Sequence, residues 1–416
     1  MEASGAAGDH RFCYHRREFR LFSCRRRLLA PSQLQALIRE QFDVSLRLID
    51  LLETSGLREM ASMIENTSPV GMIDWETETE VDRSLVSVEL PEKSLSGKTT
   101  VFNVIMTGST GYLGRHILQE LVADDRVSTI HCVAIRQLDG DGTQRVPNRS
   151  PKLRLYSGNL MEPMLGLSGA DFTKLIDQAN TIIHCGASRS FWDYYQALRM
   201  PNFWSTKELI RMAVSRKIPI HFISSSGVLS PADGQSCECE PASASRLQPP
   251  TDGSLGYIAS KWASEVYLEK VSNAFGIPVH IHRATGTPLK QQPPIDVMRD
   301  MSNITSRLKI LPDDDGWDGT FDVARARDLA RTIYDHALLS ATRDGLVPKL
   351  LHHPPDSVYT CRKLWNCSMS RETLHPFTSF HCTRGRVRRS AWAWNGTSQR
   401  WIWLSAIRTR ITVVYP

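Results

Sequence analysis

From residue 101 onward, short apolar runs alternate with longer stretches whose apolar positions recur at helical spacing. The runs predict strands and the longer stretches predict helices. Strands that are apolar on both faces and alternate with helices are typical of a parallel sheet covered on both sides. The fold class expected is therefore α/β, a Rossmann-type doubly wound parallel sheet over 101–284. The predicted strands are 101–106, 128–135, 152–156, 180–184, 218–224 and 277–282, and the predicted helices are 111–123 and 259–272.

The chain before residue 101 has a different pattern. Within 31–66, apolar residues recur at helical spacing around a polar interruption at 54–56, which predicts a short helical segment. That segment is too short to bury a large core of its own. Residues 67–100 are polar, acid-rich and poor in pattern, so we expect a linker there. Residues 1–30 are basic and are expected to be disordered.

The pattern fades towards the other end of the chain. Residues 285–350 are expected to form a partial, small substrate-binding region. Residues 351–416 hold five of the ten tryptophans in a background rich in serine, threonine and arginine, without helical or alternating periodicity. We expect this tail not to be folded. The alternative is that its tryptophans form an exposed interaction surface.

Composition excludes several protein classes. The 416 residues are 41% hydrophobic and 23% charged, which is ordinary for a soluble globular protein. No apolar run approaches the roughly 20 residues that cross a bilayer, and the early basic residues are not followed by a signal-peptide core. Nine cysteines are too few and too scattered for a disulfide scaffold. The pair Cys237 and Cys239 lacks a metal-ligand spacing, so no metal site is predicted.

The net charge of +6 belongs to the two ends of the chain. Residues 1–31 hold seven arginines against three acidic residues, and residues 351–416 hold ten lysines and arginines against two acidic residues. The middle of the chain is therefore net acidic. Because the basic runs are short and match no binding motif, we expect neither nucleic-acid nor membrane binding.

A glycine-rich turn follows the first predicted strand. Its sequence, T-G-x-x-G-x-x-G, lies where a strand passes into a helix. Glycines allow the backbone to turn tightly and approach a pyrophosphate, and the helix N-terminus offers unpaired N–H groups. The turn therefore predicts a dinucleotide site. It comprises Thr107, Gly108, Ser109, Thr110, Gly111, Tyr112, Leu113 and Gly114.

The end of the second predicted strand favours NADPH as the cofactor. NAD-binding domains usually place an acidic residue about 20 residues after the glycines, on the ribose 2′-hydroxyl. Here that strand ends in Arg136, with no acidic residue before Asp139. A guanidinium can pair with a 2′-phosphate through two hydrogen bonds. The alternative is a solvated surface arginine.

A Y-x-x-x-K motif, Tyr257 to Lys261, lies at the start of the predicted helix 259–272 and follows the glycine turn by about 145 residues. Residues four apart share one face of a helix. The Lys261 ammonium would lower the pKa of the Tyr257 phenol, which could then donate a proton to a carbonyl oxygen as hydride arrives. The alternative is an ordinary amphipathic helix with a partly buried lysine.

Three serines, Ser224 to Ser226, lie at and just after the end of the strand predicted at 218–224. Carboxyl ends of strands in such sheets face the ligand crevice, so a hydroxyl there could bind the substrate carbonyl. We favour Ser225, although spacing alone does not choose among the three. The alternative is a polar turn.

Taken together, these motifs resemble an extended short-chain dehydrogenase/reductase. More narrowly, the chain resembles the thioester reductase domain of fungal polyketide synthase–peptide synthetases and carboxylic acid reductases. The resemblance covers about 100–335. The stretches that carry it are VIMTGSTGYLGRHILQELVADDRV, IHCVAIR, TIIHCGASRSF, STKELIRMAV, IPIHFISSSGVL, GYIASKWASEVYLEKV and IPVHIHRATG.

The resemblance implies a role for each motif residue. In the family, the residue at Tyr257 donates the proton and the residue at Ser225 orients the carbonyl. The residue at Lys261 contacts the ribose and tunes the pKa of the phenol. The glycine turn would hold the pyrophosphate, and Arg136 the 2′-phosphate. Asn159 and Leu160 stand in the family's G-D-L motif, here G-N-L, which would contact the cofactor.

Two further departures from the family pattern are present. The usual N-x-x-G-T is Asn202-Phe203-Trp204-Ser205-Thr206, and the usual R-P after the sixth strand is Arg283-Ala284. These departures bear on activity more than on fold.

Residues 31–66 resemble the last two helices of an acyl or peptidyl carrier domain. The serine that carries phosphopantetheine in such domains would fall near position 28, where this chain has Leu28. The remnant therefore could not be charged. The expected partner is a carrier domain that supplies a phosphopantetheine thioester in trans.

The resemblance implies an NADPH-dependent thioester reductase that releases a carrier-bound chain as an aldehyde or alcohol, in cytoplasmic secondary-metabolite biosynthesis. A first alternative is non-redox release by Dieckmann condensation, which uses no NADPH. A second is an inactive, truncated remnant of a megasynthase.

Overall fold

The computed structural model divides the chain into two units, Met1–Gly71 and Met72–Pro416. In the first unit, the helices α1 (Pro31–Phe42) and α3 (Leu57–Glu65) accompany a small apolar core. The Gln35 side chain donates a 2.7 Å hydrogen bond to the Leu46 carbonyl. The core residues are Ile38, Val44, Leu46, Leu51 and Met60. The described residues of the chain are 31–44, 46, 50–51, 54, 56–67, 73–82, 85, 101–136, 150–190, 193–229, 243–247, 256–286, 320–339 and 348–360.

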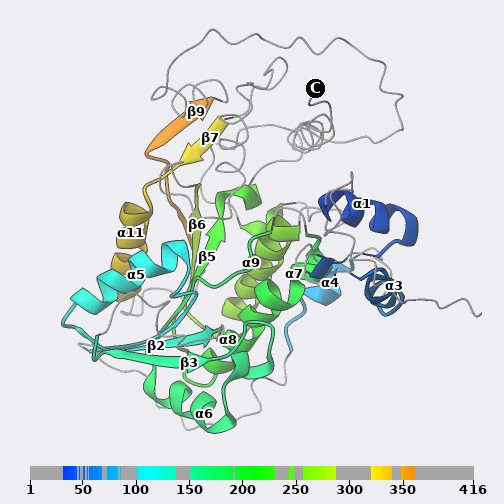
Figure 1. Ribbon diagram of the computed structural model, residues 1–416. Helices are drawn as coiled ribbons and strands as arrows, with labels where there is room; N and C mark the ends of the chain where they lie inside the picture. The colour runs from blue at the N-terminus through cyan, green and yellow to red at the C-terminus, as the bar shows by residue number, and fades with distance from the viewer. Residues whose placement is uncertain are drawn as a thin grey trace, which may run out of the picture. The chain divides into compact units, whose positions relative to one another are not determined.

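The second unit is built on a seven-stranded sheet in the order β3-β2-β1-β4-β5-β6-β8, with every neighbouring pair parallel (Figure 1). The predicted parallel sheet is confirmed, and all six predicted strands are present within two residues of their expected bounds. The strands are β1 (Phe102–Thr107), β2 (Val127–Ile135), β3 (Leu153–Ser157), β4 (Thr181–His184), β5 (Ile220–Ser225), β6 (Val279–Ala284) and β8 (Lys349–His352).

Helices cover both faces of this sheet, as the doubly wound class requires (Figure 1). On one face, α5 (Tyr112–Ala123) and α11 (Ala326–Leu339) pack into a shared apolar core with β1 and β2. On the other face, α6 (Gly169–Gln178), α8 (Ser205–Ala213) and α9 (Gly256–Phe275) share a second core with β4, β5 and β6.

The expected domain boundary at residue 284 is wrong. The seventh strand, β8, extends the sheet beyond β6, and α11 covers the same face as α5, so both belong to the nucleotide-binding fold. A small antiparallel pair, β7 (Thr320–Val323) and β9 (Ser357–Thr360), accompanies them. The tail expected to be unfolded from 351 is therefore folded as far as residue 360. Residues 361–416, with their tryptophans, lie outside the described residues, as do residues 1–30.

The linker expected over 67–100 is also wrong for residues 73–82. There, α4 (Trp75–Glu78) places Trp75 in the sheet domain's core, with ring centroids 4.8 Å from Tyr195 and 5.4 Å from Trp262. The Glu78 carboxylate accepts hydrogen bonds from the Tyr195 phenol and the Arg199 guanidinium. These contacts make 73–82 part of the sheet domain. Tyr195 lies in the short helix α7 (Tyr195–Leu198), and Arg199 begins the π-helical turn η4 (Arg199–Trp204).

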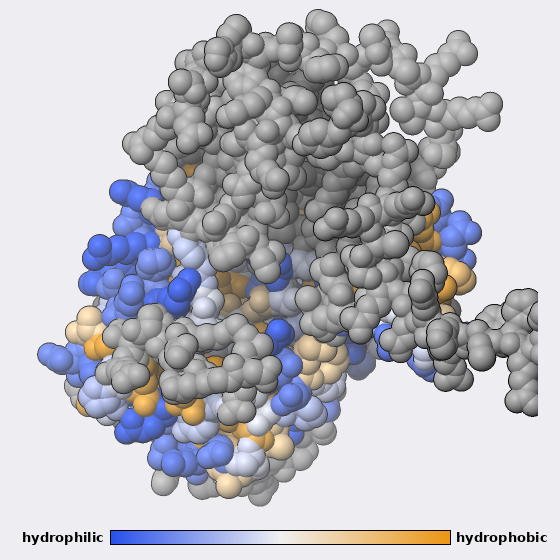
Figure 2. Space-filling view, viewed as in Figure 1, coloured by the Kyte–Doolittle hydropathy of each residue, from blue (hydrophilic) through white to orange (hydrophobic). Residues whose placement is uncertain are grey.

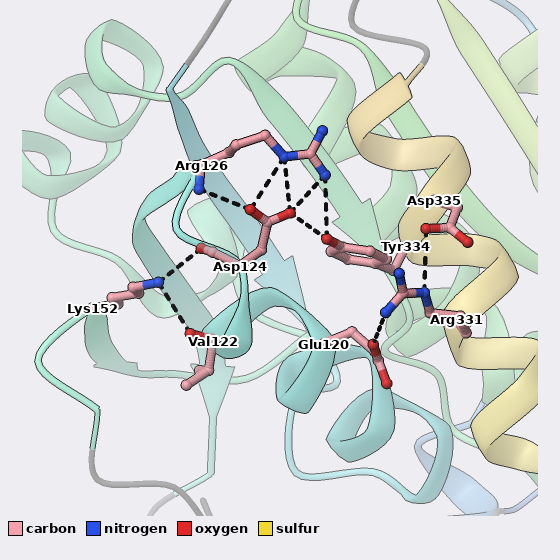
Figure 3. Close-up of polar contacts among 8 residues, drawn as sticks. All are labelled: Glu120, Val122, Asp124, Arg126, Lys152, Arg331, Tyr334 and Asp335. Carbon is pink, nitrogen blue, oxygen red and sulfur yellow. Dashed lines mark hydrogen bonds and ion pairs between the residues drawn. The ribbon is translucent and has the colours of Figure 1, made fainter.

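Polar contacts fix α5 against α11 and β2 (Figure 3). The Asp124 carboxylate, just after α5, accepts hydrogen bonds from the Arg126 guanidinium and the Tyr334 phenol. The Arg126 hydrogen bonds hold the pKa of Asp124 well below its usual range. On the next turn, Arg331 of α11 forms a 2.7 Å ion pair with Glu120 of α5. Figure 2 shows mainly hydrophilic residues on the outer surface of these two helices.

No helix among the described residues is long and apolar enough to cross a membrane.

Candidate active site

The sheet reverses its strand order between β1 and β4, and this switch point places the site. In open α/β sheets, ligands bind outside the carboxyl ends of the strands at such a point. The glycine turn follows β1, and a second turn containing Gly186 follows β4. Ser225 ends β5, the next strand along. The structure thus brings the predicted cofactor turn and the predicted catalytic serine to the same edge of the sheet.

The glycine turn is tightly packed against its neighbours. Gly108 has φ +71°, and a Cβ there would lie 2.5 Å from the Gly186 backbone nitrogen. A Cβ on Gly114 would lie 2.0 Å from the Gly108 carbonyl oxygen, which also accepts a 2.9 Å hydrogen bond from Gly111 N–H. No side chain could occupy Gly108 or Gly114 without moving backbone.

The N-terminus of α5 is available to an anion. Its N-cap is the exposed Gly111, which supplies no side-chain hydrogen bond. At the opposite end of the helix, the Lys152 ammonium donates to the carbonyls of Val122 and Asp124, at 3.0 and 2.8 Å (Figure 3). A cation there complements the negative end of the helix dipole, while the N-terminal N–H groups remain positive. This arrangement fits a dinucleotide pyrophosphate.

The other residues of the turn differ in exposure. Thr107 and Ser109 are buried, whereas Thr110, Tyr112 and Leu113 are half-buried. The Thr107 hydroxyl contacts His184 and the Gly186 amide, so its side chain supports the turn from behind. A cofactor contact by Thr107 would have to come from its backbone.

Arg136 lies immediately after β2, the strand beside β1, and is exposed. The end of β2 is irregular: Ala134 has φ +57°, and the register with β3 shifts between Cys132 and Ile135. Bulges of this kind redirect the side chains near a strand end. The guanidinium is thus carried at the carboxyl edge, next to the strand that bears the glycine turn.

Asn159 and Leu160 follow β3 and take different positions. The Asn159 side chain accepts a 3.2 Å hydrogen bond from the Met161 N–H, so it caps its own turn. A Cβ on Gly186 would lie 3.1 Å from Leu160 Cδ1, which places Leu160 against the turn after β4.

The structure distinguishes between two of the serines that the sequence left open. Ser224 is buried, and its hydroxyl donates to the Glu265 carboxylate of α9. Ser225 is half-buried at the end of β5, and its oxygen accepts a 3.2 Å hydrogen bond from Gly227 N–H. Because Ser224 is bonded inward, Ser225 is better placed to meet a substrate. Ser226 begins a short 3₁₀ turn, η5 (Ser226–Leu229).

Tyr257 and Lys261 lie on successive turns of α9, as predicted. The Lys261 ammonium nitrogen is 5.8 Å from the centre of the Tyr257 ring and 4.5 Å from that of Phe222. Lys261 is buried and donates a 2.7 Å hydrogen bond to the Ile223 carbonyl. α9 is thereby joined to β5 two residues before Ser225.

The electrostatics of this pair differ from the expectation. Burial lowers the pKa of Lys261 to about 8. Burial raises the pKa of the Tyr257 phenol, and the nearby Arg189 only partly opposes this. The expected lowering of the phenol pKa is therefore wrong: the pKa is raised, because desolvation of the phenol outweighs the positive charge nearby.

A buried ion pair beside the site is not predicted by any of the motifs. Glu265 lies one turn after Lys261, and its carboxylate pairs with Arg283 of β6, with a shortest N–O distance of 2.7 Å. Both side chains are 0% exposed. The four-residue spacing of Tyr257, Lys261 and Glu265 was the available signal.

A family model described as "Male sterility protein", NAD_binding_4, matches residues 106–288. Among curated proteins, the chain is 39% identical over 381 residues to the hybrid PKS-NRPS synthetase buaA of Petromyces alliaceus, covering 89% of this chain and 9% of that protein. It is 39% identical over 312 residues to the fusarin C synthetase of Gibberella fujikuroi, covering 73% of this chain and 8% of that protein. The chain thus spans under a tenth of the length of these relatives.

Two solved structures share the fold. The terminal R domain from the myxalamid PKS-NRPS biosynthetic pathway is 23% identical, with a TM-score of 0.58, covering 70% of this chain and 74% of that one. The PhqB reductase domain from Penicillium fellutanum is 21% identical, with a TM-score of 0.52, covering 76% of this chain and 79% of that one.

Proposed function

We propose that this chain, which matches the family model described as male sterility protein over residues 106–288, is an NADPH-dependent thioester reductase. Its substrate would be a carrier-bound polyketide or peptidyl chain, released as an aldehyde or alcohol. One observation carries the proposal: the glycine turn, Ser225 and the Tyr257–Lys261 helix meet at the switch point of one parallel sheet.

The residues divide the chemistry between them. NADPH, when bound, supplies hydride to the thioester carbonyl carbon. The Ser225 hydroxyl orients the carbonyl oxygen, and the Tyr257 phenol donates the proton that the oxygen takes up. A phenol whose pKa is raised by burial is fully protonated at neutral pH, as a proton donor must be. The resulting hemithioacetal then collapses to an aldehyde and a free thiol.

Lys261 is proposed to support this step in two ways. Its hydrogen bond to the Ile223 carbonyl fixes α9 against the strand that carries Ser225. Its charge lies near the Tyr257 ring and would stabilise the phenolate formed when the proton leaves. Family resemblance also assigns it the cofactor ribose.

Cofactor choice and substrate supply are parts of the same proposal. Arg136, exposed at the end of β2, favours NADPH over NADH because a guanidinium pairs with a 2′-phosphate. Leu28, at the position expected for the carrier serine, favours a carrier domain acting in trans.

The test is consumption of NADPH in the presence of an acyl-pantetheine thioester or a separately loaded carrier protein. Products are identified by mass spectrometry, and Tyr257→Phe serves as the control. Aldehyde or alcohol formation that depends on NADPH supports the proposal. A cyclised product formed without NADPH would instead indicate Dieckmann release, and no NADPH binding would indicate an inactive remnant.

A further inference from the structure

His184 ends β4 and is 1% exposed, directly behind the glycine turn. Its Nδ1 lies 2.7 Å from the Thr107 hydroxyl oxygen at the end of β1. Its Nε2 lies 3.2 Å from the Thr206 hydroxyl and 3.4 Å from the Ser205 hydroxyl, both in the first turn of α8. The imidazole thus connects two elements that lie far apart in the sequence.

The hydroxyl partners determine which ring nitrogen carries the proton. The shortest contacts of the Thr206 and Ser205 hydroxyls are to carbonyls of η4, those of Asn202 at 2.9 Å and Pro201 at 2.8 Å. A hydroxyl that donates its proton to a carbonyl can only accept from the imidazole. The Nε2 of His184 therefore carries the hydrogen, and Nδ1 is an acceptor.

The Thr107 hydroxyl is the partner of the other ring nitrogen, Nδ1. It donates to the Nδ1 of His184 and accepts a 3.0 Å hydrogen bond from Gly186 N–H. With a neutral imidazole, both ring nitrogens and the Thr107 hydroxyl have hydrogen-bond partners. Burial lowers the pKa of His184 to about 3, which agrees with that state. A second proton on the ring would meet the Thr107 oxygen and displace its donated hydrogen bond.

These bonds act on the backbone that forms the cofactor turn. Gly186 is the residue against which Gly108 packs, since a Cβ on Gly108 would lie 2.5 Å from the Gly186 nitrogen. The Gly108 carbonyl in turn accepts the Gly111 N–H at the start of α5. The position of the turn is thus coupled, through Thr107 and His184, to the first turn of α8.

We propose that His184 is a positioning residue that holds the glycine turn in its dinucleotide-binding geometry through the Thr107 hydroxyl. The proposal rests on the NADPH site proposed above. It assigns His184 no contact with cofactor or substrate.

The test is a double-mutant cycle on NADPH affinity, measured by fluorescence titration without substrate. Thr107→Val and His184→Leu each leave buried polar groups without a partner, and each is expected to weaken binding about tenfold. Because both break one chain of bonds, the double variant is expected to lose about tenfold as well, not about a hundredfold. Thr107→Ser keeps the hydroxyl and is expected to restore affinity.

Thr181→Val is the matched control. Thr181 lies on the same strand as His184, and its buried hydroxyl has no hydrogen-bond partner among the described residues. The NADPH affinity of Thr181→Val is expected to equal that of the unmodified protein. Thr206→Val, which leaves Ser205 as an acceptor, is a milder variant with an expected loss of about threefold.

A second readout does not depend on the cofactor. Hydrogen exchange at 107–111 and 185–188 in the cofactor-free protein should speed up in Thr107→Val and His184→Leu but not in Thr181→Val. Unchanged exchange, additive losses in the double variant, or full affinity in folded His184→Leu would overturn the proposal. Faster exchange in a protein that binds no NADPH even when unmodified would overturn the proposed function and leave the role of His184 standing.

Discussion

The Lys261 ammonium donates a 2.7 Å hydrogen bond to the carbonyl of Ile223, two residues before Ser225. This bond joins the helix that carries Tyr257 to the strand that carries the candidate substrate-orienting serine. Because a buried ammonium is costly to desolvate, the charge on Lys261 lowers the stability of the folded protein.

Replacing Lys261 by Met should separate stability from activity. The folded pKa of Lys261, about 8, lies below its usual value, so burial of the charge opposes folding at neutral pH, and this penalty is relieved as pH rises from about 8 towards 10.5. Lys261→Met is expected to raise the melting temperature by about 2 °C at pH 7 while lowering turnover at least about 100-fold. Calorimetry and NADPH consumption check the two halves, and a variant that melts earlier and still turns over would contradict this account.

Arg136 should decide between the two dinucleotides. Arg136→Ala is expected to weaken NADPH binding about 10- to 100-fold and to leave NADH binding unchanged, because only NADPH carries the 2′-phosphate. Arg154→Ala, which removes an exposed arginine from the neighbouring strand β3, is the matched control and should change neither affinity. Equal losses for NADPH and NADH would show that Arg136 does not select the phosphate.

The two serines at the end of β5 should respond differently to removal of the hydroxyl. Ser225→Ala is expected to lower kcat about 10- to 100-fold without a change in stability, because its oxygen lies at the edge of the site. Ser224→Ala takes a donor from the buried Glu265 carboxylate and is expected to cost ~1–3 kcal/mol of unfolding free energy. Steady-state kinetics measure kcat, and denaturant titrations measure the unfolding free energy. A loss of stability in Ser225→Ala, with a loss of kcat in a stable Ser224→Ala, would contradict this assignment.

A buried group of histidines should make the fold sensitive to mild acid. His221 bonds to His282, which bonds to His353, with N–N distances of 3.1 Å, and His280 stacks on His221 at 4.5 Å. Burial, the main cause, lowers the pKa of all four, to about 4 for His280 and His353. Electrostatic interactions with His336 lower all four pKa values further, and those with Lys349 and His352 add to this for His280 and His353, respectively.

The direction in which stability changes with pH follows from proton linkage. These imidazoles bind protons near pH 6.5 in the unfolded chain, whereas in the folded chain His280 and His353 do so only near pH 4, so stability is full above 6.5 and falls as pH drops towards 4. Urea midpoints should decrease across this window, and His280→Phe should make the decrease shallower. A flat profile between pH 7 and 5 would mean that these imidazoles are not held neutral by the fold.

Short-range pattern was sufficient for the main elements of the sheet and for the strands and helix that carry the motif residues. The pattern did not reveal β8, because a strand of four residues directly after Pro348 is too short to show a period. Trp75 was missed for a similar reason: α4 is a single turn, and its place in the core depends on Tyr195 and Trp262, far along the chain.

Electrostatic properties were harder to predict than positions. The spacing of Tyr257 and Lys261 placed them correctly on one helix, but the direction of the phenol pKa depends on burial, which spacing does not report. The bonds of His184 span 77 residues to Thr107 and 22 to Thr206, so no local motif carries them.

The most direct test of the central claim is turnover of an acyl-pantetheine thioester with NADPH by the unmodified chain and by Tyr257→Phe. The account predicts NADPH consumption matched by aldehyde or alcohol, reduced about 100- to 10,000-fold in Tyr257→Phe while NADPH affinity stays the same. Equal turnover by the two proteins, or product formed without NADPH consumption, would contradict it.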